Sequence, residues 1–124
     1  MKEPISTAII EGIWQIEKAE LAGEEMPALV ASKIEVELTA GEYVVRFAGD
    51  VSDRGNYTLG APATGPTITL TGIAGTNAGR TIPAIYRFVG ENLHICYGLD
   101  GVAPAGFATK AGAALFLAIY RRKT

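Results

Sequence analysis

The sequence has few of the residues that cross-link a small protein or bind metal. It contains one cysteine and one histidine among 124 residues, so a disulfide within the chain is excluded. His94 and Cys96 lie two residues apart, on one face of an expected strand, but no second histidine or cysteine completes a zinc site or a catalytic dyad. We therefore predict no metal and no cofactor. His94 is expected on the strand surface, and Cys96 as a small packed thiol.

A surplus of charge of one sign is also missing. The net charge is −2, and acidic and basic residues alternate except at the basic end 121–123. Nucleic-acid-binding proteins usually present a basic face, so we expect no nucleic-acid partner. The longest apolar run, at 111–120, is half the length of roughly 20 residues that a membrane helix needs. We therefore expect no membrane span.

The start of the chain has no apolar stretch behind a basic region, as a secretory signal would. The sequence as written therefore predicts a cytoplasmic protein, and secretion stays open if a signal peptide was trimmed. The length favours a single domain over residues 1–124, large enough to bury a core. No feature specifies an oligomeric state.

Glycine and alternating apolar residues are what the sequence does have. Its 15 glycines suit a chain with many tight turns. Alternation is clearest at 67–73, where Ile68 and Leu70 share one face and three threonines share the other. We expect strands at 12–21, 33–39, 42–47, 55–59, 67–73, 82–89, 93–97 and 115–122.

Most connections between these segments are short, so neighbouring strands should pair as antiparallel hairpins. A meander of this kind closes into a barrel or folds into a sandwich, because closure removes exposed edges. Only 22–31 and 98–112 are long enough for a crossover, and only 3–11 is expected to form a short helix. The prediction is an all-β fold with little helix, an antiparallel barrel or half-barrel of about eight strands.

Gly12-Ile13-Trp14 resembles the Gly-x-Trp element that opens the first strand of lipocalins. In that family the tryptophan closes one end of the barrel, and an arginine of the last strand lies over its ring. Further motifs, in order along nearly the whole chain, resemble a family of small lipocalin-like (calycin-type) domains of unknown function from planctomycete bacteria. Those motifs are 20–24 with Pro27, 55–57, 79–81, 85–86, 90–97 and 117–121.

The resemblance implies a lipocalin-like barrel in a bacterial protein, with Trp14 as the plug. Arg121 aligns with the terminal arginine of the family and shares strand parity with Leu117 and Ile119, so we expect it over the Trp14 ring. Arg122 is then expected in solvent. The family carries an Arg-Pro pair before the last strand, and this chain has Ala-Pro there, at 103–104. Any role that the family's arginine has at that position is therefore not expected in this chain.

The segment 74–81 nearly matches the sequence motif of a phosphate-binding loop. Ala74 and Arg80 stand where such a loop needs glycine and lysine, and the residues that follow alternate as a strand instead of opening a helix. We interpret this segment as a glycine-rich connection between strands.

Aromatic residues with inward parity form the candidate binding set. Tyrosines among them could line a pocket and offer hydroxyl groups to an amphipathic ligand, or the rings could simply fill a small barrel. Glu20 shares the parity of Trp14, so it is either a polar anchor at the mouth of a pocket or is turned to water by a bulge. The candidate ligand-binding residues are Tyr43, Phe47, Tyr57, Tyr86, Phe88, Tyr97 and Glu20.

Three functions remain open at this point. The leading hypothesis is non-catalytic binding of a small apolar or amphipathic molecule inside the barrel. The second is a structural or protein-interaction module with a filled core, whose sign would be an exposed apolar patch. The third is a lipocalin-type isomerase or hydrolase, and it is the weakest because no acid, base or nucleophile constellation is evident. The sequence thus leans against an enzyme.

Overall fold

The computed structural model describes residues 10–63 and 65–123. A short helix, α2 (Ala28–Ala31), lies among the strands of this part of the chain. The strands are β1 (Gly12–Leu21), β2 (Glu24–Glu25), β3 (Ile34–Thr39), β4 (Glu42–Phe47), β5 (Asp50–Gly60), β6 (Thr67–Gly75), β7 (Thr81–Val89), β8 (Asn92–Gly98) and β9 (Leu115–Arg122).

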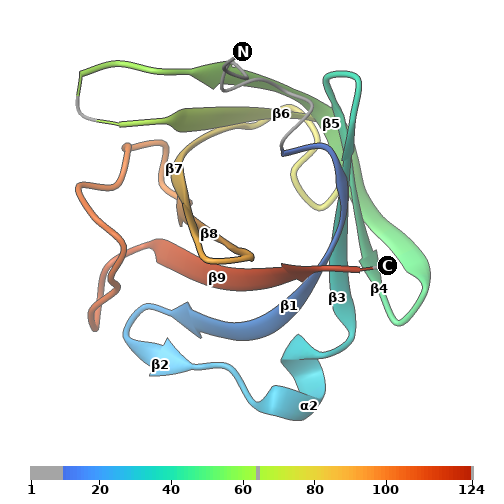
Figure 1. The fold of residues 1–124 in the computed structure, drawn as a ribbon, viewed down its shortest axis with the longest axis horizontal. Helices are drawn as coiled ribbons and strands as arrows, with labels where there is room; N and C mark the ends of the chain where they lie inside the picture. The colour runs from blue at the N-terminus through green and yellow to red at the C-terminus, as the bar shows by residue number, and fades with distance from the viewer. Residues whose placement is uncertain (1–9, 64, 124) are drawn as a thin grey trace.

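The strands form one antiparallel sheet that closes on itself (Figure 1). From β3 to β9 each strand pairs with the next one in the sequence, and β1 pairs with both β3 and β9. The two-residue strand β2 pairs only with β1 and stays outside the barrel wall. The fold is therefore a closed, antiparallel, eight-stranded β-barrel, which confirms the all-β prediction.

Three strands begin and end where the alternation predicts, at 12–21, 42–47 and 115–122. β5 differs, because it begins at Asp50 and not at Gly55. The helix expected at 3–11 falls almost entirely outside the described residues. No helix in the described residues is long and apolar enough to cross a membrane.

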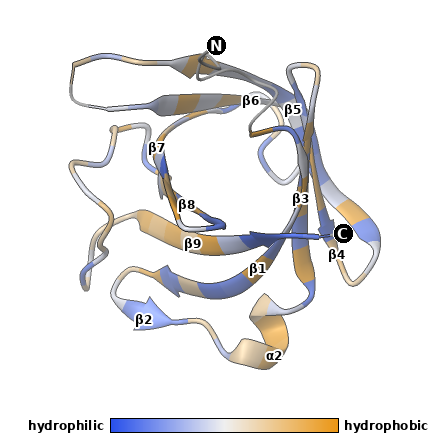
Figure 2. Ribbon diagram, in the orientation of Figure 1, coloured by the Kyte–Doolittle hydropathy of each residue, from blue (hydrophilic) through white to orange (hydrophobic). Residues whose placement is uncertain are grey.

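Side chains from alternate positions along the strands of the barrel wall form the core, and Figure 2 shows apolar and polar bands along these strands. Leu38, Ile68, Leu93 and Ile95 are all at most 2% exposed. Burying each such side chain contributes about 1.5–3 kcal/mol, which makes this interior the main source of stability.

β1 changes parity in its middle. Its register against β9 shifts between Ile16 and Lys18, the sign of a β-bulge. After the bulge Ala19 is buried, and Glu20 faces outward. The expectation that Glu20 points into the barrel is thus wrong, and the alternative, that a bulge turns it outward, is correct. Its carboxylate accepts a hydrogen bond from Thr109 Oγ1 at 2.9 Å, outside the barrel.

Candidate functional site: a polar-edged cavity in the barrel

One end of the barrel is closed by Trp14. The indole is 1% exposed, and its Nε1 donates a hydrogen bond to the Ile10 carbonyl at 2.8 Å. Phe88 from β7 lies beside it, with 6.2 Å between the ring centroids. The predicted burial of Trp14 is confirmed.

The arginine over this ring is Arg122, not Arg121. Arg122 stands directly opposite Trp14 in the β1–β9 register, and its guanidinium lies 4.3 Å from the ring centroid. Ala118 and Tyr120 are the buried positions of β9, so the inward parity continues to Arg122. Arg121 points outward and forms an exposed ion pair with Glu17 at 3.7 Å.

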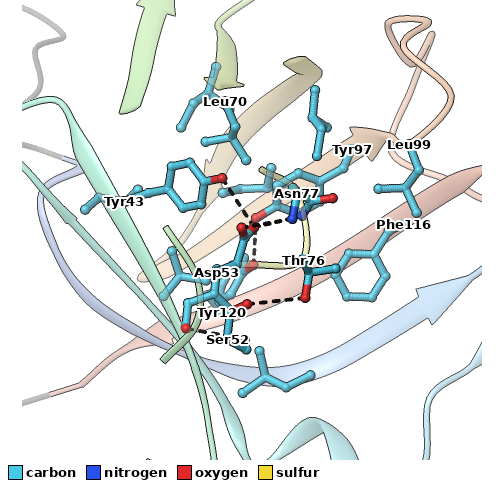
Figure 3. A pocket seen from close by; sticks show the side chains of 17 residues that line it. Tyr43, Ser52, Asp53, Leu70, Thr76, Asn77, Tyr97, Leu99, Phe116 and Tyr120 are labelled. Carbon is cyan, nitrogen blue, oxygen red and sulfur yellow. Dashed lines mark hydrogen bonds between the residues drawn. The ribbon is translucent and has the colours of Figure 1, made fainter. Parts of the chain in front are cut away.

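The opposite half of the barrel contains a cavity of about 240 Å³. Its lining includes residues of β5, of the β6–β7 connection and of the β8–β9 connection, namely Ser52, Asp53, Thr76, Asn77 and Leu99. Its walls are mostly apolar, and Figure 3 shows the side chains around it. The apolar and aromatic lining residues are Ile34, Val36, Leu38, Tyr43, Val45, Ile68, Leu70, Ile82, Ile95, Tyr97, Leu99, Phe116 and Tyr120.

Asp53 is the polar centre of the cavity. It is 5% exposed, and among the described residues it is the buried charged side chain. Its Oδ1 accepts a hydrogen bond from the Asn77 backbone N–H at 3.1 Å. Its Oδ2 accepts from Asn77 Nδ2 at 2.8 Å and from the Tyr43 hydroxyl at 3.3 Å. Figure 3 shows Asp53 between these two partners.

The connection 76–80 brings Asn77 to Asp53 by folding back onto β5 and β6. Gly72 permits this, because a Cβ there would lie 1.9 Å from the Asn77 carbonyl oxygen. Gly75 has a φ of +96°, and its Cβ would lie 2.4 Å from the Ser52 carbonyl oxygen. Thr76 then donates two hydrogen bonds to that same oxygen. The interpretation of 74–81 as a glycine-rich connection between strands is confirmed.

The tyrosine hydroxyls at the cavity remain protonated donors at neutral pH. Burial, together with the charge of Asp53 and the hydrogen bond to it, raises the pKa of Tyr43 to about 12. Tyr97 and Tyr120 share a hydrogen bond of 2.7 Å between their hydroxyls. Burial raises the pKa of both. Such groups can orient a ligand, but they are poor bases and nucleophiles at pH 7.

No group of three or more potential metal ligands occurs in residues 10–63 and 65–123. Asp53 accepts two of its three hydrogen bonds from Asn77, one from the backbone N–H and one from the side-chain amide, so its carboxylate is held as a fixed acceptor. The arrangement thus places a fixed carboxylate and tyrosine hydroxyl groups in an apolar cavity, which are groups that can orient a small molecule.

The predicted aromatic set is divided between the two halves of the barrel. Tyr43 and Tyr97 line the cavity. Tyr57 and Tyr86 are buried toward the Trp14 end: the Tyr57 N–H bonds to Gly41 in the β3–β4 turn, and Tyr86 packs edge-on against Phe88.

The inward burial expected for two further aromatic residues is wrong. Phe47 is 43% exposed and Phe88 is 38% exposed, although both have inward parity. Each stands near the end of its strand, where the wall no longer covers it. Apart from Tyr43 and Tyr97, the predicted set therefore does not surround the cavity.

Sequence reasoning missed Asp53, Asn77, Phe116 and Tyr120. Asp53 shares the parity of Gly55 and Tyr57, so counting back in twos along β5 would have placed it inside. The other three had no comparable signal, since Asn77 lies in a connection and the β9 residues are apolar on both faces.

His94 and Cys96 lie on the outer face of β8. His94 is half-buried, and burial together with the charge of Arg87 lowers its pKa. Cys96 is fully buried, as expected for a packed thiol.

No protein-family model matches the chain. No curated protein and no solved structure matches it significantly.

Proposed function

We propose that this protein is a lipocalin-like binding protein that holds a small apolar or amphipathic molecule in its barrel without transforming it. The observation that carries the proposal is the cavity of about 240 Å³, with apolar walls and Asp53, Asn77 and Tyr43 at one point of its lining. Small-molecule sites combine apolar walls with a few convergent polar groups in this way.

The size of the cavity limits the ligand. Drug-sized ligands occupy pockets of about 300–1,000 Å³, whereas an engineered apolar cavity of about 150 Å³ accommodates benzene. A volume of about 240 Å³ therefore fits one ring with a short substituent.

The lipocalin-like part of the proposal rests on the closed end. An up-and-down barrel of eight strands, an initial Gly-x-Trp and an arginine of the last strand over that ring occur together here. A structural module with a filled core is less well supported, because the interior contains the cavity.

A nitrogen–proton NMR titration with toluene and with benzyl alcohol tests the proposal. We expect saturable shifts at the amides of cavity residues such as Ile95 and Asn77, and little change at the Trp14 end. Val45→Phe should abolish these shifts because Val45 lines the cavity. Val44→Phe is the matched control, since Val44 is the preceding residue of the same strand and does not line the cavity.

Absence of saturable shifts with either compound would contradict the proposal. Equal loss in Val45→Phe and Val44→Phe would place the binding elsewhere on the molecule.

A further inference from the structure

We infer that the ligand is a small organic cation, a protonated primary amine on an apolar or aromatic body, whose ammonium group binds the Asp53 carboxylate. This inference rests on the proposed function, because it names the chemical class of the molecule in the same cavity. It is carried by three features of the lining: the charge of Asp53, its remaining acceptor capacity and the aromatic rings around it.

Asp53 has no cationic partner in the described part of the chain. The ion pairs there join Glu35, Glu37 and Glu17 to lysine or arginine, and none includes Asp53. Arg80 is the cation connected to it most directly, and its guanidinium donates to the amide oxygen of Asn77, at 3.1 Å, and to the Leu99 carbonyl, not to Asp53 itself. A buried charge is costly unless an opposite charge or a full set of hydrogen bonds compensates it. A bound ammonium group supplies the missing charge.

The carboxylate also has room for a further donor. A carboxylate has about four lone-pair sites, and the hydrogen bonds from Asn77 and Tyr43 use three of them. Two of these bonds go to Oδ2 and one to Oδ1, so Oδ1 retains a site. An ammonium group has three donors and no acceptor, which matches an oxygen that can only accept.

The rest of the lining suits a cation with an apolar body. Tyr43, Tyr97, Phe116 and Tyr120 contribute aromatic rings to the same cavity. Tyr97 and Phe116 are stacked, with 5.7 Å between their centroids. Aromatic faces attract cations, and the attraction increases where water is excluded. An anionic ligand would meet the charge of Asp53 at short range and is disfavoured.

The experiment compares benzylamine with benzyl alcohol at pH 7, by calorimetry or NMR titration of the whole chain. The two probes have the same ring and nearly the same size, and only the amine is protonated. Both probes can donate a hydrogen bond to the carboxylate, but only the amine brings an opposite charge, so we expect benzylamine to bind at least roughly tenfold more tightly. Benzoate should bind more weakly than benzyl alcohol.

Asp53→Asn should remove the preference for the amine while benzyl alcohol still binds. Asp50→Asn is the matched control, because Asp50 lies on the same strand and is exposed. Tyr43→Phe retains the carboxylate and should retain the preference. Since Asp53 also anchors the connection 76–80, the wild-type comparison of the two probes decides the matter even if Asp53→Asn does not fold.

Equal affinity of the wild-type protein for benzylamine and benzyl alcohol would overturn the inference and leave the proposed function standing. Asp53 would then serve only to hold Asn77. Failure of toluene, benzyl alcohol and benzylamine alike to bind would overturn both.

Discussion

The guanidinium group of Arg122 lies 4.3 Å from the centre of the Trp14 ring and also donates a hydrogen bond to the Glu11 carbonyl at 2.7 Å. These contacts join the end of the last strand to the start of the first. They close the barrel at the same place where Trp14 fills its end. The two arginines of β9 therefore have different roles, although they are neighbours in the sequence.

Trp14→Ala should lower the free energy of unfolding by about 3–5 kcal/mol, because it leaves a large cavity. Arg122→Ala should cost about 0.5–2 kcal/mol through the lost contact with the ring. Arg121→Ala removes only an exposed ion pair with Glu17 and should cost about 0–1 kcal/mol. Urea denaturation of the three variants measures these differences. A larger loss for Arg121→Ala than for Arg122→Ala would contradict the assignment.

The choice between these arginines could not be made from the sequence pattern. Residues 115–120 are apolar on both faces, so alternation gives no parity for the last strand. The eight strands themselves were predictable, since alternation and glycine turns mark most of them. In β1 the bulge after Ile16 reverses the parity, and nothing in the local sequence specifies where the reversal falls.

The five tyrosines of the chain should stay protonated near pH 10, the ordinary pKa of tyrosine, while the protein is folded. Burial raises the pKa of each of them: Tyr43, Tyr57, Tyr86, Tyr97 and Tyr120. The unfolded chain ionises its tyrosines at lower pH than the folded protein does. The stability that comes from keeping them protonated is therefore complete below pH 10, and it is lost as the pH rises through the pKa values of the folded state. For Tyr43 that window runs from pH 10 to about 12.

Absorbance titration of tyrosinate measures this directly. We expect little signal at pH 10 in the folded protein and a steep rise together with unfolding at higher pH. The same chain in concentrated urea should titrate gradually near pH 10, the ordinary value for tyrosine. A folded protein in which several tyrosines ionise at pH 10 would contradict the buried positions.

Gly72→Ala should destabilise the protein by about 1–3 kcal/mol, because the added Cβ would overlap the Asn77 carbonyl oxygen and displace the connection 76–80. The displacement should also shift the NMR signal of the Asn77 side-chain amide, which is bonded to Asp53. Gly106→Ala is the control, since nothing lies within 4 Å of a Cβ at that position. Equal effects of the two substitutions would show that Gly72 does not hold this connection.

The cavity was harder to predict than the barrel for a physical reason. Hydrophobic alternation identifies apolar residues that face a core, and Asp53 is a polar residue in an inward position. The pattern therefore began the expected strand at Gly55, two residues after Asp53, although β5 begins at Asp50. Asn77 reaches the site through a tertiary contact from a connection, and strand periodicity carries no information on such contacts.

Cys96 should resist alkylation in the folded protein. It is fully buried although it lies on the outer face of β8, and Ala108 of the connection 99–114 contacts it there. Burial raises the pKa of its thiol, and a hydrogen bond with the backbone of Ala108 counters part of that rise. Arg87 holds the same connection, with its guanidinium 4.2 Å from the centre of the Phe107 ring.

Phe107→Ala should therefore expose the thiol more often. Loss of the contact with Arg87 costs about 1 kcal/mol. The fraction of molecules in which the connection 99–114 has moved away from Cys96 should then rise roughly fivefold, and the alkylation rate with it. Val102→Ala is the matched control on the same connection, since Val102 is 65% exposed. Alkylation monitored by mass spectrometry under native conditions compares the variants with wild type. If both variants react at the wild-type rate, the contact between Arg87 and Phe107 does not hold the cover, and exposure of Cys96 depends on unfolding of the whole barrel.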